Sequence, residues 1–127
     1  MAQLTEDMIT AGGNLVRELD LEKVTINVAL WLLNEEADQW NLVLAMPKVR
    51  QIGPRKTYLL IGKAVSKLNR REVTMSNVVA VDQTDPLPRA VRSAIGTGPS
   101  PALARIRVTS SMFNGIAIPD ALIYRSR

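Results

Sequence analysis

The segment of residues 23–46, KVTINVALWLLNEEADQWNLVLAM, determines the fold class of this chain. Along residues 23–33 every second side chain falls on the same face of an extended strand, and apolar residues occupy both faces toward the end. Residues 40–46 alternate in the same way. The polar stretch of residues 34–39 indicates a turn, so the segment predicts an antiparallel hairpin.

A helix is expected before this hairpin. Thr5 is a suitable hydroxyl N-cap, and Glu6 and Asp7 place negative charge in the first turn, where the helix dipole is positive. An apolar stripe at helical spacing follows and includes Gly12. A glycine on the apolar side of a helix predicts close packing against a neighbouring element.

A second helix and a short strand are expected after the hairpin. Gly53 and Pro54 open the helix, with proline at the first helical position, and Asn69 lies near its end. Residues 78–81 are all apolar, which predicts a central strand covered on both faces.

The last third of the chain predicts one helix and a second hairpin. Asp85 precedes a short helix that ends near Gly96. Residues 104–109 and 116–124 are two strands, joined by a turn at Asn114-Gly115. The order αββαβαββ predicts an α+β two-layer sandwich with a mainly antiparallel or mixed sheet and helices on one face. We expect one globular domain spanning residues 1–127, because this length buries a sufficient core.

Composition narrows the classes of function. The chain has no cysteine and no histidine, which excludes disulfides and thiolate metal sites and removes the commonest general base. We expect no catalytic residue, metal or cofactor, and the sequence favours a protein without enzymatic activity. The N-terminus has no basic start or apolar run, and the longest apolar stretch covers only residues 28–33. These features predict a cytoplasmic protein without a membrane partner.

Two carboxylates are candidate ligands for Mg²⁺. Asp82 and Asp85 directly follow the strand of residues 78–81, where oxygen ligands could converge. The favoured alternative is that Asp85 caps the third helix while Asp82 turns the chain.

Charge is divided by position along the chain. Residues 1–40 carry eight acids and two bases, whereas residues 41–127 carry fourteen bases and four acids. The asymmetry predicts a polyanionic partner, or self-association between acidic and basic surfaces.

Four cations of the second helix form a candidate nucleic-acid site. Lys63, Lys67 and Arg70 follow Lys56 at offsets of 7, 11 and 14 residues, so all four fall within a narrow arc. A linear array of cations suits the phosphates of a nucleic acid. The alternative is a solvated helix face.

The start of the second helix is a candidate anion site. Arg50, Gly53, Arg55 and Lys56 combine cations with the positive end of a helix. The run of residues 50–55, RQIGPR, resembles the pyrophosphate-binding turn of acyl-CoA N-acetyltransferases. This resemblance implies a β-α-β-β order for the second half of the chain and an acyl-CoA site at these residues. The alternative is an ordinary basic helix start.

Trp31 and Leu33 are candidate interface residues. Helices on one face of a sheet cover only one face of the first strand, which leaves these two side chains near the acidic turn of residues 34–39. An aromatic anchor within a charged rim is typical of an interface. We therefore expect a small binding module that associates as a homodimer. The alternative is that the third helix or the C-terminal hairpin covers Trp31 within one chain.

Overall fold

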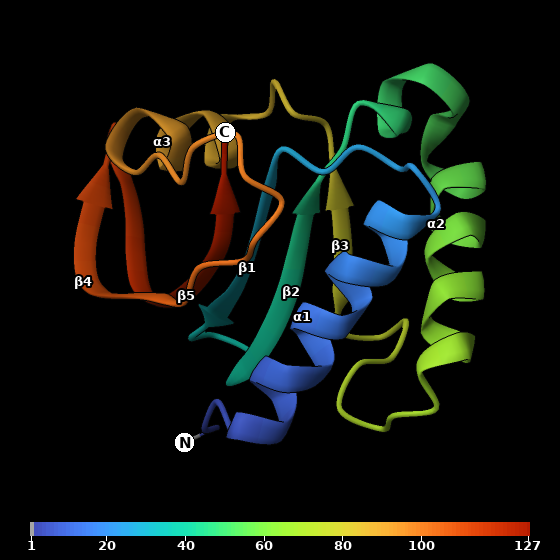
Figure 1. Cartoon of the computed structure of the whole chain (residues 1–127). Coiled ribbons are helices and arrows are strands. Elements are labelled where there is room, and N and C mark those ends of the chain that lie inside the picture. The colour runs from blue at the N-terminus through green and yellow to red at the C-terminus, as the bar shows by residue number, and fades with distance from the viewer. Residues whose placement is uncertain (1) are drawn as a thin grey trace.

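The computed structural model describes residues 2–127 and contains, among them, three helices and one five-stranded sheet (Figure 1). The helices are α1 (Glu6–Leu21), α2 (Lys48–Leu68) and α3 (Pro86–Ala94). The strands are β1 (Val28–Asn34), β2 (Gln39–Ala45), β3 (Val78–Val81), β4 (Ile106–Phe113) and β5 (Ile116–Ser126). The α+β class and the order of the elements predicted from the sequence are confirmed.

The sheet has the strand order β3-β2-β1-β5-β4. β1 and β2 form the predicted hairpin, with pairs running from Val28–Ala45 to Asn34–Gln39. β4 and β5 form the second hairpin, and Asn114 (φ 48°) and Gly115 (φ 79°) adopt the left-handed conformations of its tight turn. Only β2 and β3 are parallel, because α2 carries the chain across between them.

β3 is an edge strand, so its predicted central position is wrong. The strand is apolar because it is covered on both faces while lying at the end of the sheet. Val78 and Ala80 pack into the core beneath α1 and α2, whereas Val79 and Val81 pack into the core beneath α3. Burial on two faces sets the composition of a strand, but it does not determine which strands flank it.

Helices lie on both faces of the sheet. α1 and α2 cover the face that carries Trp31, Leu42 and Leu44. α3 covers part of the opposite face, where Val91 packs against Leu30 and neighbouring side chains. α3 therefore adds a third layer to the predicted two. Among residues 2–127, no helix combines the length and apolarity that crossing a membrane requires.

The first strand begins five residues later than predicted. Lys23 adopts a left-handed conformation (φ 60°), and the Val24 amide donates to the Leu19 carbonyl at 2.9 Å, which closes the end of α1. Val24 and Ile26 are buried in the irregular segment beneath α1, on the opposite side of the sheet from Val28. The alternation of apolar residues before Val28 therefore arises from burial of a connecting segment and not from a strand.

α2 also begins earlier than predicted, at Lys48, and it is interrupted at Gly53. Gly53 has φ 84° and ψ 160°, a conformation that glycine adopts without steric strain. Pro54 then opens the longer helical segment, as the sequence predicted. The Thr57 hydroxyl donates to the Gly53 carbonyl at 2.8 Å and fixes this kink.

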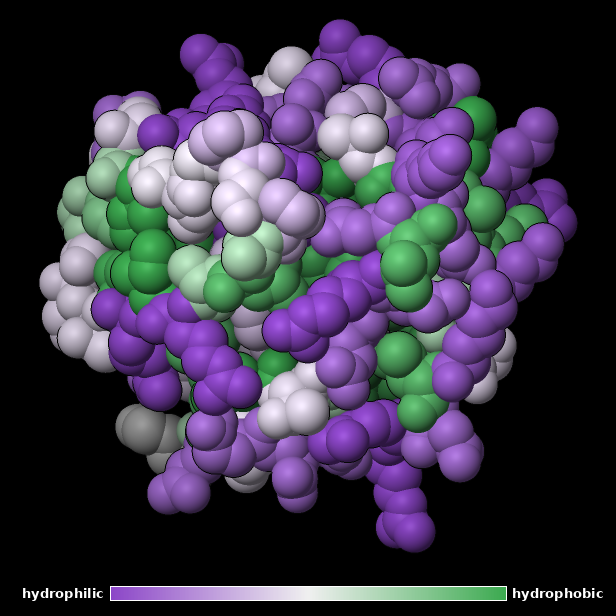
Figure 2. Space-filling model, viewed as in Figure 1, coloured by the Kyte–Doolittle hydropathy of each residue, from purple (hydrophilic) through white to green (hydrophobic). Residues whose placement is uncertain are grey.

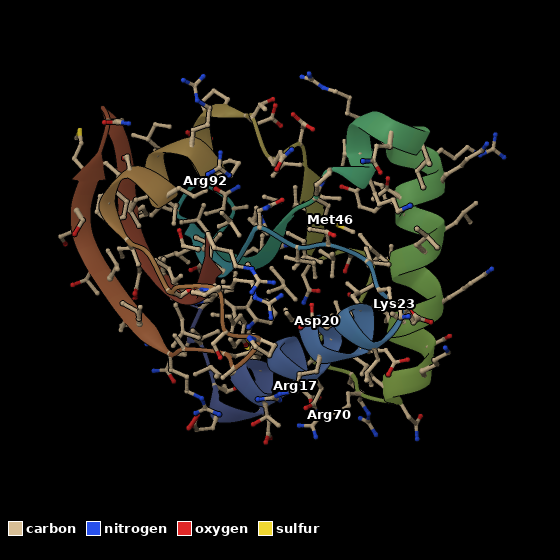
Figure 3. The ribbon with its side chains drawn as sticks, turned by 45° about the horizontal axis from the view of Figure 1, so that its top comes forward. Arg17, Asp20, Lys23, Met46, Arg70 and Arg92 are labelled. Atoms are coloured by element: carbon tan, nitrogen blue, oxygen red, sulfur yellow. The ribbon has the colours of Figure 1, made fainter. Side chains whose placement is uncertain are left out.

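The acidic first third and the basic remainder of the chain pair with each other in several places. Arg125 of β5 binds Asp20 of α1, a residue labelled in Figure 3, with a closest N–O distance of 2.7 Å. Lys67 of α2 lies 2.7 Å from Glu22, and Arg105 lies 3.1 Å from Glu6. Part of the charge asymmetry therefore acts within the chain and stabilises the docking of α1.

Candidate binding surface along helix α2

Trp31 is part of the core, so its predicted role as an exposed interface anchor is wrong. The side chain is fully buried, and its Nε1 donates to the Tyr124 hydroxyl at 2.9 Å. A methyl group on Gly12 would lie 2.6 Å from Trp31 Nε1, so the glycine lets α1 approach the indole closely. Leu33 is half-buried and packs against the same core. α1 and β5 thus cover Trp31 within one chain.

Tyr124 connects this core to the backbone of α1. Its hydroxyl accepts from Trp31 and donates to the Ile9 carbonyl. Burial raises the pKa of Tyr124 to about 12, because the neutral phenol is favoured in an apolar surrounding. The hydroxyl is therefore a neutral structural group at physiological pH.

The candidate anion residues are divided between two surface hollows. Arg50 donates to the Thr84 hydroxyl at 3.2 Å and lies 3.5 Å from Asp82, beside a hollow of about 120 Å³. Arg55 instead lines a hollow on the exposed side of α2. Gly53 has no atom near its open side, and Lys56 is exposed. The structure does not bring Arg50 and Arg55 to one site.

Asp82 and Asp85 hold the loop that leads into α3. Asp82 accepts from the backbone amide and the hydroxyl of Thr84, and these hydrogen bonds, with the charge of Arg50, lower its pKa. Asp85 accepts from the Asp82 amide at 3.2 Å. Within residues 2–127, no group of three or more Asp, Glu, His or Cys side chains could hold a metal ion.

The predicted cation arc on α2 is half neutralised. Lys67 lies 2.7 Å from Glu22 and 3.5 Å from Glu18, and the hydrogen bond to Glu22 raises its pKa. Arg70 lies 3.2 Å from Glu72. Among the residues that the structure describes, Lys56 and Lys63 are exposed and form no ion pair. Two of the four predicted cations therefore remain available to a partner.

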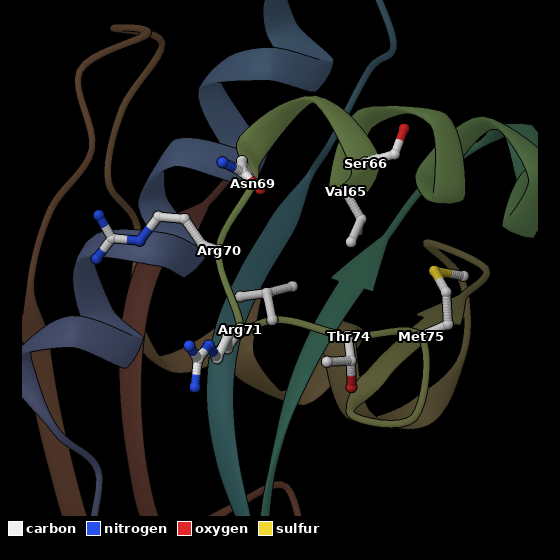
Figure 4. A pocket seen from close by; sticks show the side chains of 8 residues that line it. Val65, Ser66, Asn69, Arg70, Arg71, Thr74 and Met75 are labelled. Carbon is white, nitrogen blue, oxygen red and sulfur yellow. The ribbon is translucent and has the colours of Figure 1, made fainter.

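Two hollows of about 590 Å³ each lie along the exposed side of α2, and we call them together the α2 groove. Ser66 and Met75 line both hollows, so the two hollows adjoin each other. Figure 4 shows one hollow between α2 and the loop that follows it, with Val65 pointing in from the helix and Met75 from the loop. The lining of the groove comprises Arg55, Tyr58, Leu59, Gly62, Lys63, Val65, Ser66, Asn69, Arg70, Arg71, Val73, Thr74 and Met75.

The α2 groove combines apolar side chains with cations. Leu59 is 61% exposed and Met75 is 42% exposed. The lining contains four cations and no acidic residue, and three of these cations (Arg55, Lys63 and Arg71) form no ion pair among residues 2–127. Figure 2 shows hydrophobic surface in separate patches among hydrophilic side chains on the viewed face, including the side where α2 lies. The groove thus suits a ligand with both apolar and anionic groups.

One backbone donor at the edge of β3, beside α2, is already bound within the chain. The Ala80 amide donates to the Tyr58 hydroxyl at 2.9 Å. A backbone donor of the outermost strand is therefore already bound, which disfavours the addition of a sixth strand at this edge.

The sequence pointed to the groove cations Arg55, Lys63 and Arg70, but Leu59 and Met75 were missed. Leu59 could have been found from the sequence, because it lies outside the apolar stripe of α2. An apolar residue outside that stripe faces solvent, as Leu59 does. Met75 and Arg71 lie in the loop after α2, and periodicity does not place a loop against a helix.

Comparison of the chain with protein-family models, curated proteins and solved structures gave no match. The fold and the α2 groove define a small α+β protein with a cationic, partly apolar surface groove.

Proposed function

We propose that this protein is a non-catalytic binding module and that the α2 groove is its binding surface. The observation that carries the proposal is the combination, in one groove, of exposed Leu59 and Met75 with three unpaired cations. Elsewhere, cations such as Arg125, Arg105 and Lys67 pair with acids of α1, so their charge is neutralised within the chain. Three of the four groove cations form no ion pair among the described residues and are left for a partner.

An acyl-CoA site is not part of this proposal. The cations predicted for such a site are divided, because Arg50 is engaged by Asp82 and Thr84 in a hollow separate from that of Arg55. Dimerisation through Trp31 is likewise not proposed, because its side chain is inaccessible.

The dye anilinonaphthalene sulfonate tests the proposed surface, because it joins apolar rings to one anionic group. We expect its fluorescence to rise saturably with the native protein. Leu59→Glu should weaken binding roughly 10- to 100-fold, because the apolar contact is lost and negative charge is added. Leu59 is 61% exposed, so the melting temperature should stay within a few degrees of that of the unchanged protein.

Met112→Glu is the matched control for this experiment. Met112 is 66% exposed on β4, outside the α2 groove, so its replacement makes the same chemical change at another surface. Dye binding should be unchanged in this variant. Loss of binding in Met112→Glu, or its retention in Leu59→Glu, would show that the α2 groove is not the site.

Nucleic-acid binding is a second candidate function, supported by the exposed and unpaired Lys56 and Lys63. We expect any such binding to be independent of base sequence and to weaken steeply with salt. Replacing both lysines with glutamate should abolish it, whereas Arg89→Glu on α3 should not. A gel shift at low ionic strength checks this, and no complex with the unchanged protein would remove this candidate.

A further inference from the structure

The two hollows follow one another along α2. The first hollow is lined by α2 residues between Arg55 and Ser66, and the second by Val65 and Ser66 near the end of α2 and by residues 69–75 after it. An occupant that fills both hollows must present apolar side chains along one side. Two side chains at positions i and i+7 of a helix meet this requirement, because they lie on the same face about 10 Å apart.

The charges of the groove define the chemistry of its occupant. Arg55 lies at one end, Lys63 beside the first hollow and Arg71 at the other end, and none of them is paired among the described residues. Leu59 and Met75 lie between them, and the flexible Met75 side chain adapts readily to an apolar partner. Acidic residues flanking two apolar anchors are complementary to this pattern.

The bound Ala80 amide at the edge of β3 argues against an extended occupant. A bound strand gains affinity from hydrogen bonds to an open sheet edge. Here the Tyr58 hydroxyl already binds the Ala80 amide. This favours an occupant that binds through its side chains, as an amphipathic helix does.

We propose that the α2 groove binds an acidic amphipathic helix of a partner protein, with apolar anchors at i and i+7 in the two hollows. This inference rests on the binding function proposed above and specifies the partner. A nucleic acid fits less well, because its phosphates would bind the cations but make no favourable contact with the apolar lining. The Tyr58 ring is also half-buried and tethered, which leaves it poorly placed to stack on bases.

Gly62 offers a variant that fills the groove without disturbing the core. A Cβ atom built on Gly62 meets only Met75 Sδ, at 3.9 Å, so a longer side chain there extends into the first hollow. Gly62→Leu also replaces a glycine within a helix, which favours folding. Gly96→Leu is the control, because Gly96 has no atom within 4 Å of its open side and lies outside the groove.

The experiment uses a labelled peptide of about 20 residues with leucines at i and i+7 and glutamates around them, a length that suits a helix of several turns. Fluorescence anisotropy measures its binding to the full chain. We expect saturable binding that Gly62→Leu weakens at least 10-fold and that Gly96→Leu leaves unchanged. A peptide with lysine in place of glutamate, and one with the leucines moved out of register, should each bind at least 10-fold more weakly.

Several outcomes would overturn the inference. Equal binding of the lysine peptide or the out-of-register peptide would remove the proposed specificity, and equal binding by Gly62→Leu would remove the proposed site. Binding of a DNA oligonucleotide in the groove without peptide binding would assign the surface to nucleic acid. A concentration-dependent dimer in sedimentation that Gly62→Leu abolishes, without peptide binding, would assign it to a second copy of this chain. Dye binding without peptide binding would retain the binding function and reject only the helical partner.

Discussion

Trp31→Ala is expected to remove about 3–5 kcal/mol from the free energy of unfolding, as do other truncations of large buried aromatic side chains. Trp31 is fully buried, and Gly12 of α1 packs closely against its indole ring. The cavity left by alanine could therefore close only if α1 moved. Domains of this size have total stabilities of roughly 5–15 kcal/mol, so the variant should be marginally folded or unfolded. Urea denaturation followed by circular dichroism measures the loss.

Sedimentation of the unchanged protein separates this account from an interface role for Trp31. The buried position of the indole would be contradicted if the unchanged protein were a dimer and Trp31→Ala were a folded monomer. The expected result is instead loss of the cooperative transition, or a large shift of its midpoint.

Tyr124→Phe is the companion change, because it keeps the ring and removes only the hydroxyl. Trp31 Nε1 and the Ile9 carbonyl lose their partner, which should cost about 1–3 kcal/mol. The pKa of Tyr124 is raised from 10.0 to about 12, so between these values the folded chain keeps a proton that the unfolded chain loses. Unfolding free energy must therefore fall as pH rises through this range. The difference in unfolding free energy between the unchanged protein and Tyr124→Phe should therefore shrink above a pH of about 10. Lysines also titrate in this range, but they affect both proteins alike.

The sequence predicted local structure well because local structure depends on near neighbours. Alternation along residues 40–46 located β2, and Asn114-Gly115 located the turn of the second hairpin. Gly12 was assigned to close packing because glycine on an apolar stripe has few other uses. The same local signals could not distinguish a strand covered on both faces in the centre of the sheet from one at its edge, which is why β3 was misplaced.

The candidate site was less predictable because it depends on contacts between distant segments. The helical wheel placed four cations in one arc, but the pairing of Lys67 with Glu18 and Glu22 needs α1 to dock beside α2. The α2 groove needs the loop of Met75 to fold back along the helix. Trp31 was assigned to an interface because its sheet face looked uncovered, whereas α1 covers it.

Asp20→Ala is the other change expected to lower the free energy of unfolding strongly, because it removes the carboxylate that pairs with the buried Arg125. Arg125 is 1% exposed and binds both carboxylate oxygens of Asp20, at 2.8 and 2.7 Å. Removing the carboxylate leaves the guanidinium buried, and the Pro101 carbonyl, at 3.0 Å, is then its remaining hydrogen-bond acceptor among the described residues. Breaking one side of such a pair typically costs about 3–5 kcal/mol.

Arg125→Met should cost less than Asp20→Ala, because the two partners differ in their access to water. Methionine fills much of the arginine volume, and the Asp20 side chain, which is 27% exposed, keeps part of its hydration. The double variant should be more stable than Asp20→Ala alone, since no buried charge then lacks a partner. A double-mutant cycle by urea denaturation measures the coupling between the two residues.

Glu6→Ala provides the matched exposed pair for this cycle. Glu6 also offers both carboxylate oxygens to one arginine, Arg105, at 3.1 Å each, but the two side chains are 73% and 55% exposed. An exposed pair of this kind contributes about 0–1 kcal/mol and weakens with salt, whereas a buried pair is little screened. If Asp20→Ala and Glu6→Ala cost the same, burial would not govern the strength of the Asp20–Arg125 pair. A cost that differs severalfold, and persists at high salt only for Asp20, shows that this pair fastens β5 to α1 across 105 residues of sequence.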